Sequence, residues 1–274
     1  MTKKTKKTIF TVINLANTEA DQKNVVMYAA QLAKWLELDL VLYPKSNETK
    51  LSFKEGFAQT IELAKKVKEV SVHVSKQQIN IFNFLQDLHS IAKKESAAFI
   101  IMGIEEKSME FLGKAIWTAT QKSLIPTILL PHGIKFKPYD RITIAVDLER
   151  KVQKMNVVGH LAATFNSMIN IFIENIGYSE KEYLIHNTLG HIEDYLTRIN
   201  IAYTKMRARK NKNFTKHLCK YSAKNSDLLV VEVEPGKIDS ILKQNIGILL
   251  SIDKYAQPVM LTKTRMVGTL PNFN

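Results

Sequence analysis

The sequence lacks several of the residue types on which specialised function depends. Its 274 residues include one cysteine, Cys219, so no disulfide can form within the chain, and we expect a reducing compartment. No apolar stretch approaches the ~18 residues that a membrane-spanning helix needs. The apolar run at 9–13 is too short for the core of a signal peptide. We therefore expect a cytoplasmic protein with no membrane partner.

Arginine is also scarce, although the chain is strongly basic. The formal net charge is +13, but only six of the 39 basic residues are arginines, the side chain favoured for bidentate contacts with phosphates and bases. The positive charge is spread over both halves instead of gathering in a tail or stripe, as a nucleic-acid footprint does. The two local clusters, 3–7 and 207–212, are expected to be solvated. We do not expect a nucleic-acid partner.

Two halves of the chain carry the same order of parts. Apolar strand patterns alternate with helical periodicity, and the spacing from first to fourth strand is similar in both halves. In the first half the predicted strands are 8–14, 39–44, 70–75, 97–103 and 126–131, and the predicted helices include 24–38, 52–69 and 79–96. In the second half they are 141–147, 169–174, 201–209, 227–233 and 258–263, with helices at 152–168, 179–199 and 214–226. A further helix is expected before the last strand of each half.

This alternation predicts an α/β fold with two tandem doubly wound domains, each with a mainly parallel five-stranded sheet. The domains are predicted at 1–138 and 139–274. The segment 131–141 contains Pro131, Gly133 and Pro138, which indicates a linker. No segment is left over for an unrelated enzyme domain.

The order of motifs resembles that of tandem universal stress proteins, whose domains have an adenine nucleotide alpha hydrolase-like fold. The resemblance covers nearly the whole chain. It depends on TIAVD at 143–147, FIIMG at 99–103, Gly113 before a helix, and the prolines Pro126 and Pro258 that begin the last strands. In ATP-binding members, an Asp follows the first strand, and a glycine, a second glycine and a Gly-Ser or Gly-Thr pair surround the phosphates. Glycines let backbone N–H groups approach phosphates, and a helix N-terminus favours anions.

The first half keeps part of this pattern. Asn14 stands where the family has its Asp, Gly103 matches the first glycine, and Glu106 replaces the second. Gly113 matches the third glycine, and Lys114 replaces the hydroxyl residue. Lys114 favours an anionic ligand, because an ammonium at a helix N-terminus otherwise opposes the helix dipole. A nearby glutamate is the alternative partner for Lys114.

The second half keeps less of the pattern. Asp147 matches the family's Asp, but the position of the first glycine falls on Glu232. Asn245 and Ile246 stand where the last glycine and the hydroxyl residue are expected. Asp147 can contact a ligand or cap the turn that follows its strand. We expect a degenerate nucleotide site with no cofactor, because a carboxylate beside a phosphate lowers affinity.

No catalytic or metal constellation is apparent. His186 and His191 are five residues apart, unlike the i, i+4 pairing of zinc-binding helices. Cys219 lies in a helical pattern with apolar neighbours, and we expect it to be buried and unreactive. The sequence therefore predicts a protein that is not an enzyme.

The resemblance implies a stress-response regulator or adaptor that acts through protein contacts or a small ligand, with the protein partner unknown. Its last strands are expected to join the two halves as a pseudo-dimer, and a homodimer is possible. Three alternatives stay open: an ATP-binding stress protein with slow ATPase activity, a binder of a lipid-like ligand at the carboxyl ends of the strands, and a nucleic-acid binder.

Overall fold

The structure is a computed structural model that describes residues 7–13, 19–44, 51–75, 84–104, 120, 125–147, 155–177, 182–209, 213–233 and 255–263. The first half contains β1 (Thr8–Ile13), α1 (Glu19–Trp35), β2 (Asp39–Pro44), α2 (Leu51–Lys65), β3 (Val72–Val74), α3 (Phe84–Lys94), β4 (Ala97–Gly103) and β5 (Thr127–Leu130). The second half contains β6 (Arg141–Val146), α5 (Met155–Phe165), β7 (Met168–Ile173), α6 (Glu182–Arg198), β8 (Tyr203–Arg207), α7 (Phe214–Asn225), β9 (Leu228–Val233) and β10 (Val259–Lys263). The predicted α/β fold class is confirmed.

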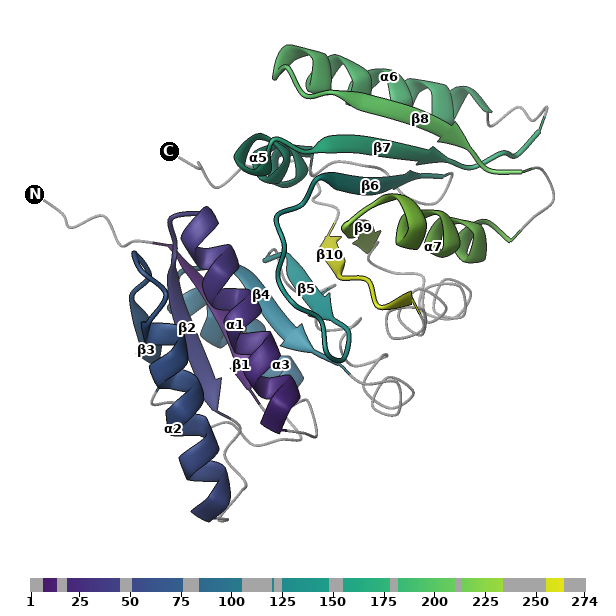
Figure 1. The fold of residues 1–274 in the computed structure, drawn as a ribbon. Helices are drawn as coiled ribbons and strands as arrows, with labels where there is room; N and C mark the ends of the chain where they lie inside the picture. The colour runs from purple at the N-terminus through teal and green to yellow at the C-terminus, as the bar shows by residue number, and fades with distance from the viewer. Residues whose placement is uncertain are drawn as a thin grey trace, which may run out of the picture.

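The strands form a single sheet in which the two halves meet at their last strands (Figure 1). The strand order is β3-β2-β1-β4-β5-β10-β9-β6-β7-β8. Neighbouring strands within each half are parallel, and β5 and β10 pair antiparallel, with Met260 opposite Ile128. The five strands of each half therefore continue into those of the other half.

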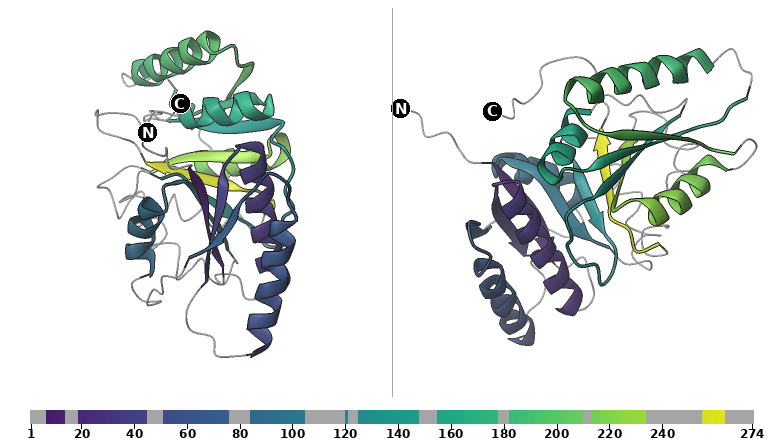
Figure 2. Two further views of the ribbon diagram at one scale, coloured as in Figure 1. Left: turned by 90° about the vertical axis from the view of Figure 1, so that its left-hand side faces the viewer. Right: turned by 45° about the horizontal axis from the view of Figure 1, so that its top comes forward.

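Helices cover both faces of this sheet. One face packs against α1, α2, α5 and α6, and buried side chains from both halves join there into one apolar cluster. The other face packs against α3 and α7 among the described elements. Figure 2 shows α3 on the side of the first-half strands opposite α1 and α2.

The central strands are buried on both faces because their sequences are continuous apolar runs. All six residues of β9 and all but the first of β4 are buried, as expected for parallel strands between two helix layers. The edge strands differ. In β8 every residue after Tyr203 is exposed, and its Lys205 and Arg207 form ion pairs with Glu193 and Glu182 of α6. Charged side chains of this kind protect an edge strand from unwanted pairing.

The predicted elements that fall on described residues are present, but some boundaries differ. The further helix expected before the last strand of each half lies almost entirely outside the described residues. Helix α1 begins at Glu19 and not at residue 24, because a contact with the linker stabilises its first turns. The buried carboxylate of Asp21 lies 2.7 Å from Nδ1 of His132 and accepts a hydrogen bond from the backbone N–H of Gly133. The apolar periodicity of the sequence begins only at Val25, so it could not reveal these turns.

Candidate functional site

The first candidate site lies in the first half, where the strand order reverses between β1 and β4. In open parallel sheets, ligands bind at the carboxyl ends of the strands at such a point. Gly103 ends β4 and is buried, and the N–H of the next residue, Ile104, donates to the carbonyl of Leu130. The other residues predicted for this site, Asn14, Gly113 and Lys114, lie outside the described residues. The structure therefore places Gly103 alone at the predicted crevice.

The equivalent edge of the second half is acidic. Asp147 directly follows β6 and is 8% exposed, and Glu232 lies near the end of β9 and is 7% exposed. Glu174 follows β7, where its N–H donates to the carbonyl of Val146 at 2.8 Å. Three acidic residues thus follow or end three neighbouring strands, β9, β6 and β7.

The register of the sheet shows that Gly103 and Glu232 occupy equivalent positions in the two halves. Gly103 is paired with Leu130, the fourth residue after Pro126. Glu232 is paired with Thr262, the fourth residue after Pro258. This equivalence depends only on strand pairing and not on the intervening loops, which differ in length between the halves. The glycine that ends the fourth strand of the first half is therefore replaced by a buried glutamate in the second half.

The consequence for ligand chemistry is large. A glycine lets a phosphate approach the backbone closely, whereas a glutamate has a longer side chain that ends in a carboxylate. Two like charges about 4 Å apart repel by roughly 4 kcal/mol at an effective dielectric near 20. Half of that energy already lowers affinity more than tenfold. A carboxylate at this position therefore disfavours a phosphate placed beside it.

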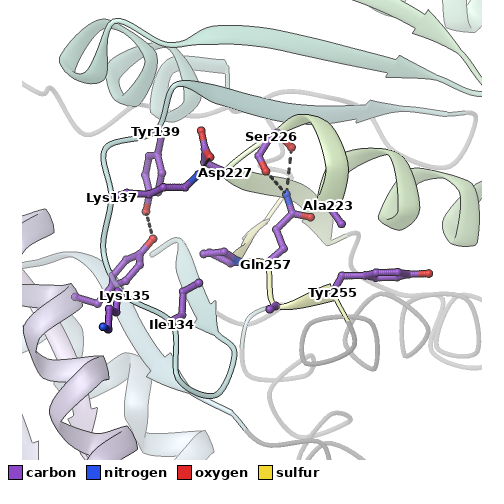
Figure 3. A pocket seen from close by; sticks show the side chains of 12 residues that line it. Ile134, Lys135, Lys137, Tyr139, Ala223, Ser226, Asp227, Tyr255 and Gln257 are labelled. Atoms are coloured by element: carbon purple, nitrogen blue, oxygen red, sulfur yellow. Dashed lines mark hydrogen bonds and ion pairs between the residues drawn. The ribbon is translucent and has the colours of Figure 1, made fainter.

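A second region of interest lies at the seam between the halves, which the sequence did not reveal as a site. Two cavities lie beside the linker that joins β5 to β6. The smaller, of about 140 Å³, is lined by linker residues and by residues that precede β9 and β10 (Figure 3). The larger, of about 310 Å³, lies between the linker and α1. We call it the seam pocket, and it is lined by Asn24, Met27, Tyr28, Gln31, Trp35, Ile134, Lys135, Phe136 and Pro138.

Polar contacts hold the linker at this seam. The hydroxyl groups of Tyr28 on α1 and Tyr139 on the linker form a buried hydrogen bond of 2.8 Å. Lys137 forms an ion pair with Asp227, whose other carboxylate oxygen accepts hydrogen bonds from the backbone N–H groups of Asp140 and Arg141. Burial raises the pKa of both tyrosines above the ordinary value, and the Asp227 carboxylate raises it further.

A side-chain network just before β10 borders the smaller cavity. Nε2 of the buried Gln257 donates to the hydroxyl of Ser222 at 2.8 Å and to the carbonyl of Ser226 at 3.0 Å. Figure 3 shows Gln257 beside Ser226, facing the linker across the cavity. The network ties α7 to the segment that leads into β10, so the smaller cavity has walls from secondary structure as well as from the linker.

The sequence does carry one indication of this region, the alternation of apolar residues and lysines along 134–138. Ile134 and Phe136 pack against the core, while Lys135 and Lys137 are exposed. An alternation of this kind predicts an extended segment with one buried face, but not which surface it covers.

The other residues considered from sequence lie apart from both regions. His186 and His191 are exposed on α6, and Cys219 is buried on α7. No group of three or more potential metal ligands is found among the described residues. The described part of the chain also has no helix that could cross a membrane.

Together, the fold and these sites define a class of protein. It is an α/β protein whose two halves each have a strand-order reversal, and whose halves are joined through antiparallel last strands. No protein-family model and no curated protein matches the chain by sequence. Solved structures do match it.

The chain has the fold of universal stress proteins. It is similar to a universal stress protein from Archaeoglobus fulgidus, with 14% identity, a TM-score of 0.66, and coverage of 93% of this chain and 96% of the other. It is also similar to a putative universal stress protein from Pseudomonas aeruginosa, with 13% identity and a TM-score of 0.60. That match covers 94% of this chain and 93% of the other. The predicted resemblance is thereby confirmed for the fold.

A similar fold also occurs in a domain of a membrane transport protein. The chain is similar to the cytoplasmic domain of a prokaryotic cation chloride cotransporter, with 10% identity, a TM-score of 0.51, and coverage of 93% of this chain and 95% of the other. Since one fold serves such different proteins, function must be argued from the sites of this chain.

Proposed function

We propose that this protein is a cytoplasmic stress-response regulator of the universal-stress-protein type that acts by binding and performs no catalysis. Its second half does not bind ATP. The observation that supports the proposal is the buried Glu232 at the position equivalent to Gly103, next to the strand that leads into Asp147. The fold supports the assignment to stress response, and the solitary cysteine agrees with a reducing compartment.

The described ends of β9, β6 and β7 lack the cationic groups that phosphoryl transfer requires. Phosphoryl transfer needs cationic groups and backbone N–H groups around the transferred phosphate. At the second-half crevice the described residues at the strand ends offer carboxylates instead, from Asp147, Glu174 and Glu232. A protein partner or a ligand without phosphates is compatible with such an edge.

The test is calorimetric titration of the nucleotide-free protein with MgATP. We expect no binding in the sub-millimolar range for wild type or for Asp147→Ala. Sub-millimolar binding that Asp147→Ala weakens would overturn the proposal, because it would place the nucleotide in the second half. Thermal melts of each variant check that it is folded.

A second candidate function is favoured by one observation, the buried Gly103 at the end of β4. This half keeps the glycine through which a phosphate could approach the backbone. In this candidate the first half alone binds a nucleotide and the second half is regulatory or structural. Sub-millimolar MgATP binding that is lost in Gly103→Val and kept in Asp147→Ala would support it over the leading proposal.

A further inference from the structure

We propose that the seam pocket binds a planar aromatic ligand that carries one negative charge. This inference goes beyond the proposed function, because the pocket lies between α1 and the linker and shares no residue with the strand-end crevices. The ligand class follows from the shape and lining of the pocket and from the charge that faces it.

The wall supplied by α1 is a single helical stripe. Asn24, Met27, Tyr28, Gln31 and Trp35 follow one another at spacings of three and four residues, which places them on one face of the helix. Most side chains of this face are only partly buried. Trp35, the last residue of the stripe, remains 45% exposed, so part of its ring is accessible to a ligand.

Aromatic rings give the pocket its preference for a flat apolar ligand. Phe136 on the linker meets Tyr28 edge to face, with ring centroids 5.1 Å apart. Trp35 packs against Phe165 of α5 at 5.3 Å, and Phe136 lies 6.3 Å from the same ring. The rings of Trp35 and Phe136 are thus held by neighbours from both halves of the chain. Rings held in this way can stack with a planar ligand at little entropic cost.

Three polar side chains that line the pocket are available to a ligand, whereas the Tyr28 hydroxyl already pairs with Tyr139. Asn24, Gln31 and Lys135 form no hydrogen bond or ion pair with any described residue. No acidic residue lines the pocket, so Lys135 gives it a positive charge. One ammonium and two carboxamides suit a carboxylate or a similar anion, which accepts hydrogen bonds from all three.

The size of the pocket limits the ligand to one or two fused rings. Its volume of about 310 Å³ is at the lower end of the range for small-molecule sites, roughly 300–1,000 Å³. Such sites are common at domain interfaces. A ligand here would touch α1 and the linker together.

The experiment uses 2-naphthoate as the probe and 2-naphthamide as its uncharged match. Calorimetry and saturation-transfer NMR on the full chain should show saturable naphthoate binding with a Kd of roughly 1 mM or tighter, and weaker binding of the amide. Lys135→Gln should weaken naphthoate binding about tenfold, the loss expected for one charge-assisted contact. It should leave amide binding unchanged.

Lys34→Gln is the matched control, because it removes the same charge from an exposed position of α1 that does not line the pocket. It should leave naphthoate binding unchanged. Gln31→Leu tests the stripe without touching the charge and should weaken binding of both probes. The proposal is overturned if naphthoate shows no saturable binding, or if it binds Lys135→Gln as tightly as wild type. Neither result depends on MgATP, so failure here is separate from failure of the proposed function.

Discussion

At the scale of single residues, the hydroxyl pair of Tyr28 and Tyr139 is the most specific contact between α1 and the linker. Both side chains are almost fully buried and their hydroxyls lie 2.8 Å apart. Tyr139→Phe leaves the Tyr28 hydroxyl buried without this partner, and we expect a loss of about 1–3 kcal/mol in the free energy of unfolding. In Tyr28→Phe/Tyr139→Phe both polar groups are gone, so the double variant should lose less than the two single variants combined. Urea unfolding measures all four proteins, and strictly additive losses would contradict the contact.

The same pair gives the protein a sensitivity to alkali. Burial holds the folded-state pKa of Tyr28 and Tyr139 above the ordinary value of 10.0, while the tyrosines of the unfolded chain ionise near that value. Above pH 10 the unfolded state therefore binds fewer protons than the folded state, and the free energy of unfolding falls as pH rises. We expect this fall to be smaller in Tyr28→Phe/Tyr139→Phe than in wild type. Denaturant unfolding between pH 9 and 11 checks the difference, and identical slopes would contradict the assignment.

At the scale of elements, two glycines in the α5–α6 pair face different surroundings. A Cβ on Gly159 of α5 would lie 2.6 Å from the hydroxyl oxygen of Tyr195 and 2.7 Å from Cδ1 of Ile199, whereas a Cβ on Gly190 of α6 would meet nothing within 4 Å. Gly190→Ala should stabilise the protein by up to about 1 kcal/mol through helix propensity. Gly159→Ala should be less stable than Gly190→Ala by about 1–3 kcal/mol, because Tyr195 and Ile199 must move. Thermal unfolding compares the two variants. Equal stabilities would show that the Tyr195 and Ile199 side chains can move away from residue 159 without loss of stability.

The sequence was most informative about the secondary-structure elements. Continuous apolar runs such as 97–103 predicted buried parallel strands, and β4 and β9 are buried as expected. The start of α1 was missed because Asp21 is polar, and its burial depends on His132 and Gly133, residues far away in sequence. Long-range contacts of this kind leave no local periodicity.

The candidate sites were predictable to different degrees. The strand ends follow from the predicted strand order, and the resemblance to universal stress proteins then placed Gly103, Asp147 and Glu232 there. The seam pocket could not, because Trp35 and Phe136 are distant in sequence and meet only when the linker crosses α1. The functional meaning of Gly103 and Asp147 stays a prediction.

At the scale of the whole molecule, the β5–β10 pair predicts how the two halves behave when separated. All four residues of β5 are buried, and so are the first four of β10. Fragments 1–138 and 139–274 would each expose an unpaired apolar edge strand, which promotes pairing with another chain. We expect each fragment alone to form dimers or larger assemblies. An equimolar mixture should form a complex with the mass of the intact chain. Light scattering tests this, and two stable monomeric fragments would show that the seam contributes little.

The junction of β5 and β10 joins two halves that can differ in sequence, because both belong to one chain. In a homodimer joined through such strands, a substitution at one crevice appears in both, because both copies have the same sequence. Here the two sides of the junction belong to one polypeptide, so one crevice can carry Gly103 while its counterpart carries Glu232. Covalent connection also fixes their ratio at one to one and keeps them together at any dilution. A single molecule can therefore contain two chemically unlike versions of the same strand end.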